Sequence, residues 1–127
     1  MKVINHLIDK EFIGVFISQP FENKTEEQIN NITKEAIDIV KNIFNENDRD
    51  FLLFYTNCNS DGYYNAFNKD RWQSAGCGIK MLSDSLFRLS QSKYAVFCPG
   101  WEKSRGCVIE KECCEKFGIE IIILEED

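Results

Sequence analysis

The stretch YAVFCPGWEKSRGCVIEKECCEKFGIEIIIL, residues 94–124, predicts a strand, a loop, a helix and a second strand in that order. Its two ends, "YAVFC" and "EIIIL", carry the aromatic and β-branched residues that are typical of buried strands. Between them we expect a helix from about Cys107 to Phe117, which ends at Gly118. Two strands joined by a helix predict a parallel pair, because parallel strands need a crossover connection.

The same alternation extends toward the N-terminus. The segment EFIGVFISQP, residues 11–20, predicts a buried strand that ends at the turn residues Ser18, Gln19 and Pro20. Thr25 and Gln28 form a capping-box pattern, which marks the start of a helix. That helix is supported by apolar residues at helical spacing, namely Ile29, Ile32, Ala36, Val40, Ile43 and Phe44.

The middle of the chain contributes one further strand and one further helix. FLLFY, residues 51–55, predicts a short buried strand, and residues 57–78 are rich in Asn, Gly and aromatics and predict a long loop. A helix follows from the spacing of Ile79, Leu82, Leu86 and Leu89. We therefore expect one domain over residues 1–127, a three-layer α/β/α sandwich with a four- to five-stranded, mainly parallel sheet of the Rossmann or flavodoxin-like kind.

Length and charge exclude several classes of function. With 127 residues and a net charge of −6, the chain lacks the lined-up Lys and Arg that sequence-independent binding to a nucleic acid polymer needs. The N-terminal residues do not follow the order of a signal peptide, and no run of 18 apolar residues occurs. We expect a cytoplasmic protein without a membrane partner.

Cysteine and histidine usage points away from metal and disulfide chemistry. Six cysteines occur without a C-x-x-C pair, and two of them are adjacent, so reduced thiols are expected. His6 is the single histidine, which leaves no familiar zinc spacing and no Cys-His or Ser-His-Asp arrangement except one built around His6 itself. We predict no metal and no cofactor.

Two loops are expected to meet beyond the carboxyl ends of the parallel strands, where such folds bind ligands. They are SQPFENK, after the first strand, and PGWEKSRG, after "YAVFC". The glycines, the serine and the arginine of the second loop can bind one phosphate, but they also suit an ordinary strand-to-helix connection capped by Ser104. The candidate ligand-binding residues are Ser18, Gln19, Pro20, Gly100, Trp101, Ser104, Arg105 and Gly106.

Glu110 follows this second loop, one turn into the expected helix. A carboxylate in a first turn is favoured by the helix dipole by roughly 0.3–1 kcal/mol, which by itself explains a glutamate there. Spacing predicts Ile109, Cys113 and Phe117 as the buried stripe of this helix, with Glu112 and Glu115 exposed. The adjacent thiols of Cys113 and Cys114 are interpreted as core packing.

The segments ISQPFENKTEEQI and LSDSLFRLSQSKYAVFCPGWEKSRGCVIEKECCEKFGI resemble small bacterial and phage members of the nucleoside 2-deoxyribosyltransferase-like superfamily. The resemblance covers residues 12–45 and 79–124, and its specific part is the motif GWE-x-[SA]-RGC-x-IE. It implies that Glu110 is a nucleophile. It further implies that Ser104 and Gly106 hold a 5′-phosphate, since members that act on unphosphorylated nucleosides carry an aspartate at the serine position.

One position departs from the superfamily pattern. Active members carry an aspartate directly before a leucine in the preceding helix, which serves proton transfer to the leaving base. This chain has Ser85 before Leu86 and carries Asp84 one position early. Because one residue turns a helix by about 100°, Asp84 is either re-aimed by a local adjustment or the general acid is missing.

The resemblance leads to two hypotheses for a small-molecule nucleoside or nucleotide ligand. The first is an N-glycosidic-bond hydrolase or deoxyribosyltransferase with Glu110 and Asp84 as catalytic residues. The second is a binding protein that sequesters a nucleotide or a nucleotide signal without turnover, as some phage counter-defence proteins do. Tyr63, Tyr64 and Trp72 either stack on the base or cover the sheet edge. By resemblance we also expect a homo-oligomer.

Overall fold

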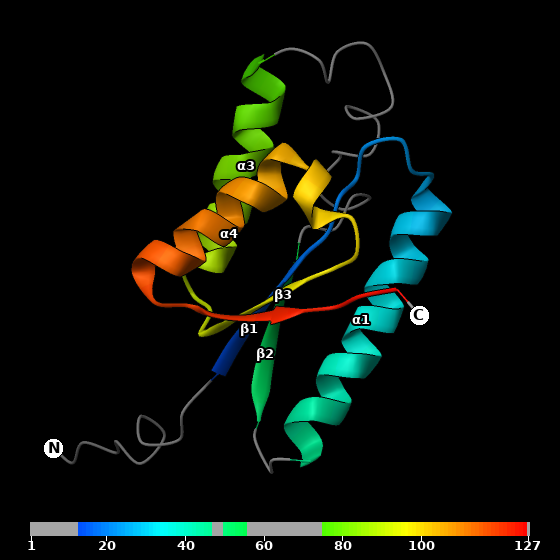
Figure 1. Cartoon of the computed structure of the whole chain (residues 1–127), viewed down its shortest axis with the longest axis vertical. Helices are drawn as coiled ribbons and strands as arrows, with labels where there is room; N and C mark the ends of the chain where they lie inside the picture. Colours follow the sequence, from blue (N-terminus) through cyan, green and yellow to red (C-terminus); the bar gives the residue numbers. More distant parts are fainter. Residues whose placement is uncertain (1–12, 47–49, 56–74, 127) are drawn as a thin grey trace, which may run out of the picture.

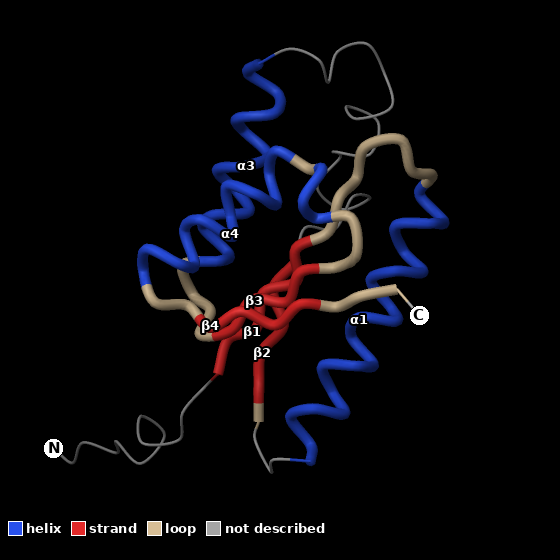
Figure 2. The backbone as a smooth tube through the Cα atoms, in the orientation of Figure 1, coloured by secondary structure: helices blue, strands red, loops and turns tan. Residues whose placement is uncertain are grey.

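A computed structural model of the chain describes residues 13–46, 50–55 and 75–126. Four strands form one parallel sheet in the order β2-β1-β3-β4, which Figure 2 shows in red. Their bounds are Ile13–Ser18 (β1), Phe51–Tyr55 (β2), Tyr94–Phe97 (β3) and Glu120–Ile123 (β4). The predicted α/β fold with a parallel sheet is confirmed.

Helices cover both faces of this sheet (Figure 1). Helix α1 (Glu26–Glu46) lies on one face, and α3 (Ala75–Leu89) and α4 (Arg105–Phe117) lie together on the other. A short 3₁₀ helix, η2 (Trp101–Lys103), precedes α4. The expected three-layer sandwich is therefore present. The loop predicted over 57–78 is wrong at its end, because α3 already begins at Ala75.

The start of α1 is set by local hydrogen bonds. The backbone N–H of Thr25 donates to Gln28 Oε1 at 2.8 Å, and the N–H of Gln28 donates to Thr25 Oγ1 at 3.1 Å. These reciprocal bonds satisfy two backbone donors of the first turn, as a capping box does. The capping-box prediction is confirmed.

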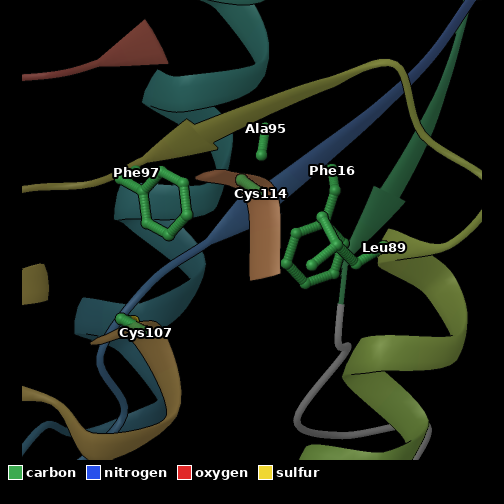
Figure 3. Packing of buried hydrophobic residues seen from close by; sticks show 6 residues of the cluster. All are labelled: Phe16, Leu89, Ala95, Phe97, Cys107 and Cys114. Atoms are coloured by element: carbon green, nitrogen blue, oxygen red, sulfur yellow. The ribbon is translucent and has the colours of Figure 1, made fainter. Parts of the chain in front are cut away.

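Strand β1 is buried on both faces, and its residues alternate between the two helical layers. Ile13, Val15 and Ile17 pack on the α1 side, in clusters with Ala36, Val40 and Phe44. Phe16 faces the opposite layer, where it lies with Leu89, Ala95, Phe97, Cys107 and Cys114 (Figure 3). By the same alternation, Ser18 belongs to the face that α4 covers.

Gly14 marks a close approach near the start of β1. A Cβ atom there would collide with the backbone carbonyl oxygen of Gln91, in the turn between α3 and β3. The N–H of Lys93 donates to the carbonyl of Gly14 at 2.8 Å, so the two backbones are joined at this point. Only glycine fits such a contact, which fixes how α3 returns to the sheet.

None of the helices in the part of the chain that the structure describes combines the length and apolar character needed to span a bilayer.

Candidate active site

The loops that follow β1 and β3 leave the sheet side by side. Ser18 pairs with Phe97 in the sheet register, and the N–H of Cys98 donates to the carbonyl of Ser18 at 2.9 Å. Gly100 then adopts a left-handed backbone, with φ of 88°, and a Cβ atom on it would lie 3.6 Å from Pro20 Cγ. The two loops therefore touch at the carboxyl edge of the sheet, where sequence analysis places the ligand.

Ser104 caps α4. Its backbone is extended, and its Oγ accepts a hydrogen bond from the N–H of Cys107 at 3.4 Å. The helix consequently begins at Arg105, and the predicted start at Cys107 is wrong by two residues. Glu110 is the sixth residue of the helix and lies beyond its first turn. The interpretation of Glu110 as a dipole-favoured cap is therefore wrong, because the dipole effect falls off within one turn.

The face that α4 buries also differs from the prediction. Ile109 is 39% exposed and Phe117 is 81% exposed, so neither belongs to a buried stripe. The buried residues are Cys107, Glu110 and Cys114, spaced by three and four positions. The capping turn at Ser104 sets the rotation of the helix and turns Cys107 toward the sheet. Glu110 follows onto the same buried face.

Glu110 lies in the interior against Ser18. The Ser18 Oγ donates a hydrogen bond to Glu110 Oε1 at 2.6 Å, and the two residues are 2% and 5% exposed. Burial raises the pKa of Glu110 from 4.5 to about 7, and the Ser18 hydrogen bond acts in the opposite direction. At neutral pH the carboxyl group is consequently divided between its protonated and ionised forms.

Neutral thiols surround this carboxylate. Burial raises the pKa of Cys107 to about 11, with a further rise from Glu110, while hydrogen bonds with Ser104 and Ser18 lower it. Burial also raises the pKa of Cys98 to about 12. Thiols with such pKa values stay protonated and are poor nucleophiles. They serve as packing groups, which agrees with the core interpretation of the adjacent Cys114.

The first turn of α4 offers donors to an anion. The N–H groups of Arg105 and Gly106 occupy the first two helical positions, which have no acceptor within a helix. A Cβ atom at Gly106 would meet nothing within 4 Å, so the space in front of this residue is open. Arg105 is exposed and forms an ion pair with Glu22 at 3.9 Å, which links it to the loop after β1. Ser104 lies directly beside these donors.

Two other candidates on the loops are engaged by the protein. The Gln19 side-chain amide donates to Thr33 Oγ1 and to the carbonyl of Ile29, while its buried Oε1 has no partner among the described residues. Trp101 packs edge-on against Phe97, with ring centroids 5.9 Å apart, and carries Lys111 Nζ 5.0 Å from its ring centroid. Both residues thus stabilise the loops around the site.

Asp84 is placed differently from Glu110. Ser85, the residue that sequence analysis compares with a catalytic aspartate, is buried at 6% exposure on α3. Asp84 is 38% exposed by its side chain and forms an ion pair with Lys80 at 3.5 Å, one turn earlier on the helix. Glu110 is thus hydrogen-bonded to Ser18 in the interior, whereas Asp84 forms an ion pair with Lys80 on α3.

The predicted base-stacking residues Tyr63, Tyr64 and Trp72, like His6, lie outside the described residues.

Sequence reasoning missed the Ser18–Glu110 pair. The sequence predicts Ser18 as a ligand-binding residue and gives Glu110 no partner. The strand alternation contains a signal for the pair, because Ser18 shares its parity with Phe16 and must face the layer that contains α4. The rotation of α4 that completes the pair has no comparable signal.

The fold is similar to that of a 2-deoxyribosyltransferase from the psychrotolerant bacterium Bacillus psychrosaccharolyticus. The superposition has a TM-score of 0.51 and covers 88% of this chain and 72% of that chain, at 12% sequence identity. That protein is described as a biocatalyst for the synthesis of antiviral and antitumoral nucleosides. A scan against protein-family models and a search of curated proteins give no match. The similarity shows that the chain has the α/β fold found in a deoxyribosyltransferase.

Proposed function

We propose that this protein breaks or transfers an N-glycosidic bond of a nucleoside or nucleotide, with Glu110 as the nucleophile. The observation that supports this most is the buried Glu110 carboxyl group, held by a 2.6 Å hydrogen bond at the carboxyl edge of a parallel sheet. This edge is where open α/β folds bind their ligands. Among the described residues no cation acts on the Glu110 pKa, and a buried carboxylate of this kind is costly to maintain, which favours a chemical role over a structural one.

The proposed reaction has two steps, which form and then break a bond between Glu110 and the sugar. One oxygen of the ionised Glu110 attacks C1′ of the sugar, and the C1′–N bond breaks with its electron pair moving to the base, which takes up a proton. A glycosyl ester of Glu110 results. A water molecule, or an N–H nitrogen of a second base, then attacks C1′, gives up its proton to solvent and releases the carboxylate, as in retaining glycosidases. The apolar surroundings strengthen the interaction of Glu110 with the positive charge that develops on the sugar ring.

We propose a 5′-phosphorylated ligand over an unphosphorylated one. The Ser104 hydroxyl, which accepts a hydrogen bond from the N–H of Cys107, can turn its proton from the Cys107 thiol toward a phosphate oxygen. The first-turn N–H groups of α4 and the open space at Gly106 lie beside it. An aspartate at position 104 would also cap the helix but would repel a phosphate, so the serine favours the charged ligand.

A second function, a binding protein without turnover, is favoured by one observation. The residue proposed to protonate the leaving base is Asp84, but its carboxylate forms an ion pair with Lys80. The neighbouring buried position on α3 carries Ser85, which has no carboxyl group. Loss of a general acid typically lowers a rate by roughly 10² to 10⁴. Such a protein retains the ligand and releases little base.

The discriminating experiment is incubation with a panel of deoxynucleoside and ribonucleoside 5′-monophosphates, the matching nucleosides and adenine dinucleotides. Chromatography then measures the free base. We expect free base from at least one phosphorylated member with the wild-type protein and none with Glu110→Gln. Tight binding of an intact ligand, with no free base released from any member of the panel, would contradict the enzyme proposal and support the binding protein.

A further inference from the structure

We infer that Ser18 is a positioning residue, which fixes one oxygen of the Glu110 carboxylate and presents the other oxygen to the sugar carbon. This inference rests on the proposed role of Glu110 as nucleophile. Ser18 Oγ bonds to Oε1, and among the described residues no hydrogen bond engages Oε2. A carboxylate held through a single oxygen keeps the second one for attack on C1′.

The donor itself is held rigidly. Ser18 is the last residue of β1, a strand that pairs with β2 on one side and β3 on the other. Its own carbonyl accepts the N–H of Cys98 at 2.9 Å, so the backbone cannot move away from the sheet. Glu110 lies in the second turn of α4, ninety-two positions later in sequence. The hydrogen bond therefore defines the distance between the central strand and the helix at the site.

The pair is poorly explained by stability alone. Two apolar side chains of similar size between β1 and α4 would pack without the desolvation cost of a buried carboxyl group. Cys107 and Cys114, the neighbours on the same buried face of α4, show that small apolar groups fit there. Because the Ser18 hydroxyl prefers an ionised acceptor, it partly offsets the effect of burial and keeps a reactive carboxylate available.

Several titratable and charged groups of the described residues lie on the elements packed around Glu110, but the interaction that lowers its pKa is the Ser18 hydrogen bond. Cys107 and Cys114 flank it on α4, and both have raised pKa values, so they stay neutral. Lys24, in the loop after β1, lowers the pKa of Cys107 and of Cys98 at the end of β3. Lys111 of α4 lowers the pKa of Cys114. Other charged groups on the packed elements are Arg105, Glu112, Glu115 and Lys116 of α4 and Lys80, Asp84 and Arg88 of α3. The raised pKa of Glu110 is caused by burial and opposed by Ser18.

The test measures the pKa of Glu110 by NMR on protein carrying ¹³C-labelled glutamate carboxyl groups, with Glu110→Gln to assign the resonance. In Ser18→Ala we expect this pKa to rise by roughly one to two pH units, the equivalent of a lost hydrogen bond to a charged group. Ser18→Thr retains a hydroxyl and is expected to restore most of the shift. The matched control is Ser92→Ala, which removes another buried serine hydroxyl, at the far end of β3, and is expected to leave the pKa unchanged.

Turnover measurements on the nucleoside 5′-monophosphate panel add the kinetic arm. The acid limb of the pH profile should move upward in Ser18→Ala by the same amount as the NMR pKa, and Ser18→Thr should move it back. An unchanged Glu110 pKa in folded Ser18→Ala, or an equal shift in Ser92→Ala, would overturn the inference. If the wild type releases no base but the pKa shift is found, Ser18 still positions the carboxylate and only the proposed reaction fails. Should Ser18→Ala not fold, Ser18→Cys replaces it, and an unchanged pKa there would likewise overturn the inference.

Discussion

The hydroxyl of Ser18, at the end of β1, donates a 2.6 Å hydrogen bond to the carboxyl group of Glu110 in the second turn of α4. Both residues are almost completely buried. The bond joins the strand and the helix that sequence analysis had assigned to the site separately.

The charge of Glu110 should make the protein less stable as pH rises. The folded-state pKa of about 7 lies above the ordinary value of 4.5, so the folded state holds the proton more tightly. Full stability is therefore present below pH 4.5 and is progressively lost up to pH 7, by about 3 kcal/mol in total. Glu110→Gln removes this loss. In urea unfolding, the variant and the wild type should have equal free energies of unfolding near pH 4.5, and the variant should be more stable by about 3 kcal/mol at pH 8.

Glu112→Gln is the matched control for this pH dependence, since Glu112 lies on the same helix with an exposed side chain, near Lys116. It should change the free energy of unfolding by less than about 0.5 kcal/mol at any pH. Parallel stability curves for wild type and Glu110→Gln would show that the Glu110 pKa is not raised.

Gly106→Ala should separate folding from ligand binding. A methyl group at this position meets nothing within 4 Å, and alanine is the better helix former, so stability should rise by up to about 1 kcal/mol. The same methyl group projects into the space where we propose the phosphate. Calorimetric titration with a deoxynucleoside 5′-monophosphate should show binding at least roughly tenfold weaker, or about 1.4 kcal/mol.

Gly14→Ala provides the contrast to this substitution, because its methyl group collides with the carbonyl of Gln91. It should lower stability by more than about 2 kcal/mol. Unaltered affinity in a stabilised Gly106→Ala would remove Gly106 from the ligand site.

Ser104→Asp should discriminate a phosphorylated from an unphosphorylated ligand. Aspartate caps a helix as well as serine does, so the melting temperature should stay close to that of the wild type. The added negative charge should lower the affinity for a nucleoside 5′-monophosphate by tenfold or more and the affinity for the matching nucleoside much less, as measured by calorimetry. Ser104→Ala loses the cap and should cost about 1 kcal/mol of stability, with a smaller loss of phosphate affinity. Equal weakening of both ligands by Ser104→Asp would contradict the phosphate proposal.

Asp84→Asn should change base release by less than about threefold, because the half-buried Asp84 pairs with Lys80 and its pair contributes at most about 1 kcal/mol. A loss of a hundredfold would instead establish Asp84 as the proton donor. Ser85→Asp places a carboxyl group at a buried position of α3, where we propose that it would protonate the leaving base. It should speed base release at least tenfold and, since the new charge is buried, lower stability by roughly 1–3 kcal/mol at neutral pH.

Much of the fold was predictable because its signals are local. Thr25 and Gln28 cap α1 through hydrogen bonds three residues apart, and Gly118 ends α4 with a left-handed backbone, φ of 78°. The continuous hydrophobic run of β1 predicts a strand that is buried on both faces, as the structure shows. The sequence predicts the start of α4 two residues too late because Arg105 and Gly106 are assigned to the loop PGWEKSRG, whereas in the structure Ser104 caps the helix and these two residues begin its first turn.

Local patterns along the chain therefore predict the succession of strands and helices, their parallel sheet and the two loops that meet at its carboxyl edge. The burial of Glu110, its hydrogen bond with Ser18 and the buried position of Ser85 beside a half-buried Asp84 emerge only from the folded chain. The physical reason is that a periodic pattern specifies which residues share a helix face. The rotation of that face toward the sheet depends on contacts between distant segments, such as the capped turn at Ser104 and the central strand that ends at Ser18.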